Sequence, residues 1–443
     1  MRRTACVCLC LSALGASPAF AAGYGLKEHS ADAMAAAYAG AAATDSDASY
    51  LAYNPAALAG VGETDFAGSL VGIVPGTKAN YLSATTSAGN PTGGAAAPRN
   101  FISDALVPSF GIRHRMSERW AVGLDISAPW GLRTDYPASW AGRYYAMKTE
   151  LLTINASPSV SYQISPGLAL GAGAQIEFAQ GALTSTIDTG TLGAANGIPG
   201  SIPGAQDSFA RVSGKSWTFG YTAGLIAKPY DGLQIGISYR SSLQHDLKGP
   251  LTFTLDSAGI GATIRALTGV FTNTRATTPL TMPDEIEMGA RQRLSDDWTV
   301  MAELDWTDWS RVHALRVEAA NPLQPDDVTT TRWHNTLFGS LGAEYRASPD
   351  FTFRAGAAYD ESPTPDATRE PRIPDADRIW LSAGVRYRVT DALDANLTLS
   401  RLFFLKSTLA LDPTIPGAAL RGTLDGTTQA YVNVVGLQMS YRP

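Results

Sequence analysis

The sequence predicts an all-β chain: an antiparallel transmembrane β-barrel of fourteen strands with a small helical N-terminal plug, or hatch, in its lumen. Three observations lead to this prediction. The chain begins with an export signal, and the rest of it contains no uninterrupted apolar stretch of the ~18 residues that a membrane-spanning helix needs. Apolar and polar residues also alternate over ten or more positions in several segments. Alternation of that length is typical of strands with one face toward lipid and the other toward the lumen.

The first 21 residues have the three parts of a signal peptide. Arg2 and Arg3 are positively charged, residues 6–14 are apolar, and Ala19-Phe20-Ala21 is a small-residue cleavage site. All three cysteines of the chain lie in this segment. The exported protein is therefore expected to contain no disulfide.

Three regions follow from this pattern: a signal peptide at 1–21, a hatch at 22–62 and a transmembrane barrel at 63–443. The hatch segment is short and rich in alanine and glycine, so it cannot bury a core of its own. We expect it to fold inside the barrel and to gate it.

Two helical stretches are expected in the hatch. Ser30 can cap a helix over 31–39. Asn54 can cap a second helix in which Pro55 occupies the first position and Ala56 follows. Asn54, Pro55 and Ala56 are therefore candidate gating residues.

The strands are expected, to within a few residues, at 64–75, 105–115, 119–130, 149–164, 168–181, 214–228, 232–246, 284–294, 298–310, 332–347, 351–359, 378–389, 392–405 and 430–441. In the third strand the alternation places one set of residues on the lipid face: Trp120, Val122, Leu124, Ile126, Ala128 and Trp130. This strand ends at Pro129-Trp130-Gly131, where proline lacks a backbone donor and glycine weakens pairing. We therefore expect a gap in the wall there, which could serve as a substrate exit, or a bulge that only shapes the rim.

Tight and long connections alternate along the chain. Six tight turns lie near 116–118, 165–167, 230–232, 295–297, 348–350 and 390–391. Seven long polar stretches lie at 76–104, 131–147, 183–213, 256–281, 311–331, 361–377 and 407–428. Such a chain has fourteen strands, and tight turns are expected on the periplasmic side.

Aromatic residues near strand ends suggest two girdles at the membrane interfaces. The residues assigned to them are Trp120, Trp130, Trp140, Tyr144, Tyr145, Trp298, Trp306, Trp309, Tyr345 and Tyr441.

Charged residues of both signs occupy lumen-facing positions, so a strongly ion-selective porin is not indicated. Some of these charges are expected to form cross-strand ion pairs that brace the wall. One or two arginines could instead contact a substrate carboxylate. Arg240 and Arg354 are the candidates.

Other function classes find little support. The net charge of −6 is spread along the chain without a basic block, so nucleic acid is not an expected partner. The five histidines are far apart, and no serine lies in a nucleophile elbow. We expect no enzymatic activity, no metal site and no cofactor.

Several motifs, taken together, resemble one family. They are Gly25-Leu26-Lys27-Glu28-His29-Ser30, Ala39-Gly40, Tyr53-Asn54-Pro55-Ala56, Pro129-Trp130-Gly131-Leu132, Trp140-Ala141-Gly142-Arg143-Tyr144, Pro283-Asp284, Asp305-Trp306-Thr307-Asp308-Trp309-Ser310 and Pro374-Asp375-Ala376-Asp377-Arg378-Ile379-Trp380. This set resembles the long-chain fatty acid and aromatic hydrocarbon transporters of bacterial outer membranes (FadL/TodX-like). The chain departs from that family at its end, Ser440-Tyr441-Arg442-Pro443, where family barrels usually end in an aromatic residue.

The resemblance implies a multi-pass protein of the Gram-negative outer membrane that takes up hydrophobic compounds passively. Long-chain fatty acids are the simplest substrates, captured near the outer loops and released past the hatch, with a wall opening near the third strand. Lipopolysaccharide and outer membrane lipid are the expected surroundings, and a monomer is expected. The alternatives are a general hydrophilic porin and a structural barrel.

Overall fold

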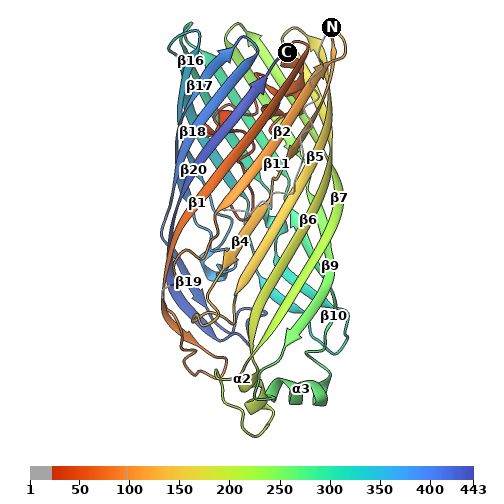
Figure 1. The fold of residues 1–443 in the computed structure, drawn as a ribbon, viewed down its shortest axis with the longest axis vertical. Coiled ribbons are helices and arrows are strands. Elements are labelled where there is room, and N and C mark those ends of the chain that lie inside the picture. The colour runs from red at the N-terminus through yellow and green to blue at the C-terminus, as the bar shows by residue number, and fades with distance from the viewer. Residues whose placement is uncertain (1–21, 97) are drawn as a thin grey trace, which may run out of the picture.

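The protein is described by a computed structural model that covers residues 22–96 and 98–443. Its dominant feature is one sheet closed into a tall barrel (Figure 1). The expected signal peptide, residues 1–21, lies outside the described residues.

Twenty strand segments make up this sheet. They are β1 Thr64–Thr85, β2 Ala105–Arg115, β3 Trp120–Ser127, β4 Gly131–Asp135, β5 Lys148–Ser165, β6 Leu168–Asp188, β7 Asp207–Tyr230, β8 Leu233–Arg240, β9 Leu243–Thr254, β10 Thr274–Met282, β11 Glu285–Arg293, β12 Trp298–Thr307, β13 Ala314–Ala319, β14 Asp327–Thr330, β15 Thr336–Arg346, β16 Phe351–Asp360, β17 Arg378–Thr390, β18 Leu393–Phe404, β19 Ser407–Leu411 and β20 Thr423–Tyr441.

The segments combine into fourteen antiparallel wall strands, which confirms the predicted fold. Six segments continue a neighbour across a bend: β4 after β3, β9 after β8, β10 before β11, β13 after β12, β14 before β15 and β19 after β18. The barrel closes where β1 pairs with β20, from Phe66 opposite Tyr441 to Thr85 opposite Thr423. Closure leaves no free sheet edge in lipid, where unpaired backbone groups are costly.

The two ends of the barrel differ as the connection lengths predict. At one end, drawn at the top of Figure 1, tight turns join the strands and the C-terminus lies; we name it the short-turn end. The opposite, long-loop end carries α2 Thr189–Ala195 and α3 Ile260–Thr268. Several strands extend further toward this end than the alternation suggested, notably β1, β6, β7 and β20. Segments expected to be loops also contain strand there, because polar residues outside the membrane can continue a ladder.

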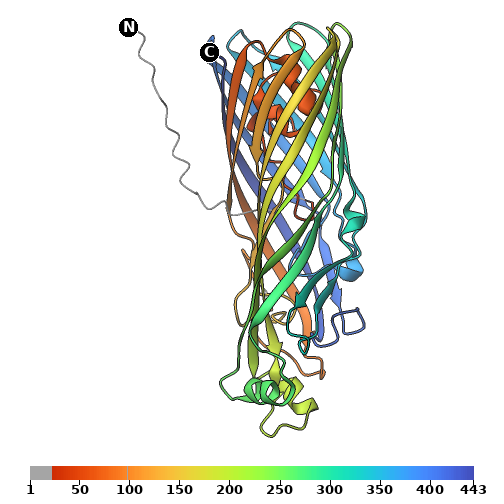
Figure 2. The same cartoon turned by 90° about the vertical axis from the view of Figure 1, so that its right-hand side faces the viewer.

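The N-terminal segment lies inside the barrel near the short-turn end (Figure 2). It contains α1 Ala31–Met34, η1 Ala48–Ala52 and η2 Pro55–Gly60. Two further short helices, η3 Trp309–Arg311 and η4 Asp366–Thr368, lie in the loops. None of the helices in the described part of the chain is long and apolar enough to span a membrane.

The cap residues of the plug act as expected, but its first helix is shorter. The Ser30 side chain accepts a hydrogen bond from the Ala33 amide, yet the helix ends at Met34 instead of continuing to residue 39. Ala37 and Tyr38 adopt positive φ angles of 50° and 65°, which no α-helix contains. The turn lies against the wall, where the Ala36 backbone occupies the space left by the missing side chain of Gly356.

The aromatic girdle is only partly as predicted. Trp120, Trp298, Tyr345 and Tyr441 are exposed on the outer surface. Five other members are buried, so their assignment to the girdle is wrong: Trp130, Trp140, Tyr144, Tyr145 and Trp309. The lipid-face assignment of Ala128 and Trp130 fails for the same reason, since both turn into the barrel. Aromatic residues at strand ends suit either an interface or a ligand cavity, and spacing alone does not separate the two.

Replacement of Gly356 by alanine should displace the plug. A Cβ atom there would lie 2.1 Å from the Ala36 carbonyl oxygen, so the plug backbone must move at a cost of about 1–3 kcal/mol. We expect faster proteolysis within residues 22–62 and a higher ion conductance in planar bilayers. Gly339→Ala is the matched control, since a Cβ there meets nothing within 4 Å. Equal behaviour of the two variants would contradict this account of the packing.

Candidate functional site

The wall is interrupted where β3 bends into the lumen. The ladder between β2 and β3 runs from Arg115 opposite Ala121 to Phe110 opposite Ile126 and stops there. Beyond it, residues 128–130 are buried inside the barrel. Pro108 on β2 and Pro129, two residues after the end of β3, have no amide hydrogen to donate to a ladder across this gap.

The start of the plug takes over the missing hydrogen bonds. The Leu26 amide donates to the Pro129 carbonyl oxygen at 2.8 Å, and the Gly131 amide donates to the Tyr24 carbonyl oxygen at 2.8 Å. On its other side, the Trp130 amide donates to Thr153 Oγ1 on β5 at 3.0 Å. The kinked segment is thus held between the plug and β5 instead of between two wall strands.

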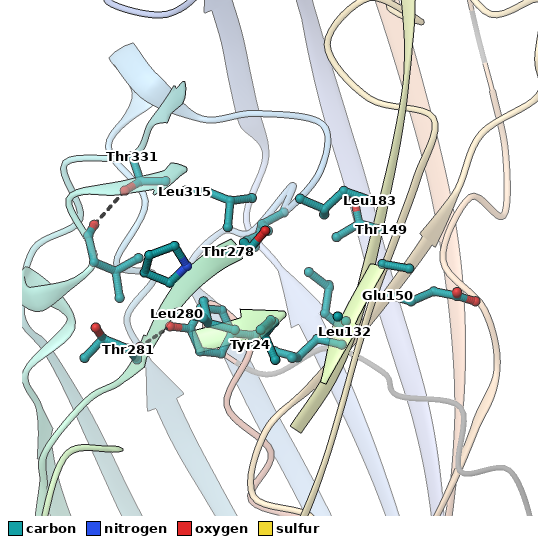
Figure 3. A pocket seen from close by; sticks show the side chains of 18 of the residues that line it. Tyr24, Leu132, Thr149, Glu150, Leu183, Thr278, Leu280, Thr281, Leu315 and Thr331 are labelled. Carbon is teal, nitrogen blue, oxygen red and sulfur yellow. Dashed lines mark hydrogen bonds between the residues drawn. The ribbon is translucent and has the colours of Figure 1, made fainter. Parts of the chain in front are cut away.

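An apolar cavity of about 150 Å³ lies next to this junction, on its long-loop side, and we name it the inner cavity (Figure 3). Tyr24 closes it on the plug side, and its hydroxyl donates to the Thr281 carbonyl oxygen. The wall supplies most of the remaining lining, including Leu132, Leu151, Leu183, Val212, Leu247, Leu280 and Leu315. Ile373, from the loop between β16 and β17, also lines it. Only a few threonine and serine hydroxyls, Glu150 and Arg311 add polarity to this lining.

Aromatic rings surround Tyr24. Its ring centroid lies 4.8 Å from that of Trp309, 5.6 Å from Trp333 and 6.0 Å from Trp130. Trp333 also lines the inner cavity. The cavity, the plug and the kink therefore meet at one aromatic cluster, and a ligand that moves Tyr24 acts on all three.

A second cavity of about 390 Å³, the outer cavity, lies nearer the long-loop end. It is bounded by apolar side chains of the wall and of α2 and α3, such as Leu251, Phe253, Leu192 and Ile264. Leu183 and Val212 line both cavities, so the two adjoin. The outer cavity also has charged residues in its lining, namely Asp188, Asp326, Asp327, Arg372 and Arg421. Together the two cavities form a largely apolar path between the long loops and the kink, with charged groups in its outer part.

The predicted residues of the second plug helix anchor the plug to the wall. Asn54 caps η2 by accepting from the Ala56 amide at 2.9 Å. Its side-chain amide donates to the Ala42 carbonyl oxygen at 2.7 Å and to the Leu225 carbonyl oxygen of β7 at 3.1 Å. Pro55 and Ala56 pack against β6, where Gly171 provides the space.

Arg240 and Arg354, predicted on the lumen side, both contact the plug. Arg240 Nη2 donates to the Ala52 carbonyl oxygen at 2.8 Å, and its Nε lies 3.5 Å from Glu285. Arg354 forms ion pairs with the buried Asp32 of the plug and, at 2.6 Å, with Glu344. These partners indicate arginines that hold the plug in position, and a substrate contact by either of them stays a prediction.

The lumen on the short-turn side of the kink is polar. Beyond Thr153, β5 carries Asn155, Ser157 and Ser161 toward the plug, and Glu177 and His245 lie near them. Several of these buried atoms have no hydrogen-bond partner among the described residues, for example Asn155 Oδ1, Ser157 Oγ, Ser161 Oγ and Glu177 Oε2. An apolar ligand is therefore disfavoured on this path.

The sequence predicted the loss of strand pairing at the kink, but not the anchoring contacts of the plug or the cavities. Tyr24, Trp309, Trp333, Leu280 and Ile373 are far apart in the chain, and only closure of the barrel brings them together. The one available signal was the aromatic density of residues 306–309, which was assigned to the girdle.

This arrangement defines a class of protein: a plugged outer membrane β-barrel that transports hydrophobic compounds. The chain belongs to the family of outer membrane transport proteins described as OMPP1/FadL/TodX, whose family model matches residues 12–442.

Similar proteins support this assignment over most of the chain. Outer membrane protein P1 of Haemophilus influenzae is 27% identical over 97% of this chain and 96% of its own length. A long-chain fatty acid transport protein of Escherichia coli is 28% identical over 85% of each chain. The crystal structure of a Pseudomonas aeruginosa FadL homologue matches with a TM-score of 0.85 at 25% identity, covering 95% of this chain and 99% of that one. The Ralstonia pickettii toluene transporter TbuX shares the fold, with a TM-score of 0.66 at 20% identity over 95% and 99% of the two chains.

Retention of the plug should depend on pH through Glu28. Its carboxylate is fully buried and accepts no side-chain hydrogen bond from the described residues. Burial raises the pKa of Glu28 from 4.5 to about 7. The Glu28 contribution to docking is therefore fully present below pH 4.5 and is lost as the pH rises toward 7, by on the order of 3 kcal/mol. Burial has the opposite effect at the adjacent His29: it lowers the pKa of His29 from 6.5 to about 3, so the His29 contribution is present above pH 6.5 and is lost as the pH falls.

Glu28→Gln removes the Glu28 contribution and keeps that of His29, so we expect proteolysis of the plug in the unmodified protein to become faster relative to that in Glu28→Gln as the pH rises from 5 to 7. Glu63→Gln, at an exposed position, is the control and should behave as the unmodified protein does. A pH profile that Glu28→Gln leaves unchanged would show that another group controls docking.

Proposed function

We propose that the protein takes up long-chain fatty acids passively across the outer membrane. The observation that carries this proposal is the largely apolar path formed by the outer and inner cavities, which ends at the interrupted wall. A ligand with a long hydrocarbon chain can leave water at the long loops and bury that chain against the apolar side chains along this path. Burial of each CH₂ group contributes about 0.8 kcal/mol, so chain length itself drives capture.

The exit proposed is lateral, through the gap between β2 and β3 into the membrane. The polar lumen on the short-turn side of the kink disfavours an apolar ligand, whereas the gap between β2 and β3 opens toward lipid. Tyr24 supports this route, since its ring closes the inner cavity and its carbonyl oxygen holds Gly131. A ligand that displaces Tyr24 would release the kinked segment at the same time.

In this proposal residues 22–62 act as a hatch on the barrel of residues 63–443. Asn54, Pro55 and Ala56 fix the segment around η2 to β6 and β7. Residues 24–26, at the start of the hatch, respond to the ligand. No energy source is invoked, because the fatty acid moves down its own concentration gradient. We propose that the barrel acts as a monomer, since one chain encloses the whole path.

A hydrophilic porin is the main rival, and the mostly apolar lining of the inner cavity argues against it. Aromatic hydrocarbons are the other substrate class, and a structural neighbour bears the name of a toluene transporter. Uptake of labelled oleate and labelled toluene by cells with and without the gene tests these possibilities. Oleate uptake that does not depend on the gene would refute the proposal.

A disulfide across the gap should block release. Ser109 and Ser127 are the next pair in register after Phe110 and Ile126, where the ladder stops. The exported chain contains no cysteine, so the double variant Ser109→Cys with Ser127→Cys can form only this bond. We expect oleate uptake to fall at least about tenfold when the disulfide is formed and to recover on reduction.

The matched control places the bond inside the intact ladder, with Ile112→Cys and Leu124→Cys. This variant should transport normally in both redox states. Persistent uptake by the fully oxidised Ser109/Ser127 variant would exclude lateral release at this gap.

A further inference from the structure

Arg372 is a buried cation without a carboxylate partner. It lies in the loop between β16 and β17, and its side chain is only 3% exposed. Within the described part of the chain, its guanidinium makes one hydrogen bond, from Nη1 to the Thr184 carbonyl oxygen at 3.4 Å. No carboxylate of the described residues lies within ion-pair distance of it. A buried charge in this state is costly unless another group pairs with it.

The neighbouring carboxylates are already engaged by a second arginine. Arg421 Nη2 lies 2.6 Å from Asp327, and its Nη1 lies 3.1 Å from Glu370. Burial and the positive charge of Arg421 lower the pKa of Arg372 below its usual range. The Arg372 site therefore disfavours its own charge as it stands, and an added anion would relieve this.

The position of Arg372 relates it to the substrate path. Arg372 lines the outer cavity, while the next residue, Ile373, lines the inner cavity. The apolar residues Leu183 and Val212 border both. The guanidinium is thus placed at the junction of the two cavities, beside these apolar side chains and beside the charged Asp327 and Arg421 of the outer cavity.

We propose that Arg372 binds the carboxylate head group of a long-chain amphiphile in the outer cavity and thereby selects carboxylates over uncharged hydrocarbons. This inference rests on the proposed function and specifies its substrate class. A guanidinium presents parallel N–H donors that match the two oxygens of a carboxylate. The apolar walls accommodate the chain, and burial of the Arg372 side chain strengthens the pairing.

An uncharged ligand gains nothing from this cation. It must fill the cavity and leave the guanidinium unpaired, whereas a carboxylate removes that cost. Hydrogen bonds to charged groups contribute about 1.5–3 kcal/mol, which corresponds to about a 10- to 150-fold difference in affinity.

The test compares oleate with methyl oleate, which has the same chain without the charge. Equilibrium binding of both labelled compounds is measured with the purified, detergent-solubilised full-length protein. We expect the unmodified protein to bind oleate at least about tenfold more tightly. Arg372→Met should lose this preference by weakening oleate alone, and Arg372→Lys, which keeps the charge, should retain part of it.

Arg265→Met is the matched control, because Arg265 lies exposed on α3 outside the cavity lining. It should keep the full preference for oleate. A retained shift in gel mobility on boiling verifies that each variant is a closed barrel.

Three results would overturn the inference: equal affinity of the unmodified protein for the two compounds, an unchanged preference in Arg372→Met, or an equal loss in Arg265→Met. The first result is obtained with the unmodified protein, so it can refute the inference even if Arg372→Met does not assemble. Gene-dependent uptake of both compounds alongside any of these results leaves the proposed function standing. Absence of binding and uptake of both compounds refutes the proposed function together with the inference.

Discussion

Backbone hydrogen bonding in lipid is the constraint on which the rest of the structure depends. Every strand amide and carbonyl within the membrane needs a partner, and closure of β1 on β20 provides the last ones. The kink after Ser127 is a local departure from this rule, and it is tolerated because residues 24–26 of the plug stand in for a wall strand. The interruption of the wall therefore depends on the plug, which supplies the hydrogen bonds that the missing wall pairing would have made.

The plug is held by charge as well as by shape. Asp32 forms ion pairs with Arg354 on β16 and Arg386 on β17. Lys27 lies 2.6 Å from Asp305 on β12. Asp32 and Asp305 are buried, so each carboxylate would be costly to leave unpaired. The ion pairs therefore fix the first part of the plug to three strands of the wall.

Alternation predicted the wall well because it reports directly on the two solvents that a strand faces. Residues 149–164 were expected in a strand, and β5 spans Lys148–Ser165. The same rule misplaced Trp130 and Trp309, since alternation does not register a strand that bends inward. Arg372 was not found at all, because its importance depends on which carboxylates Arg421 has already engaged. Patterns along the chain thus define elements, whereas competition among distant side chains defines sites.

The glycines of the wall have a consequence for the evolution of this molecule. At Gly236, Gly356 and Gly171, the plug backbone occupies the volume where a side chain would stand. Plug and wall are therefore complementary surfaces inherited as a pair, and a substitution in one restricts what the other accepts. A plug transferred into the barrel of a relative that is about 27% identical would clash with the wall unless the facing wall positions are also glycine.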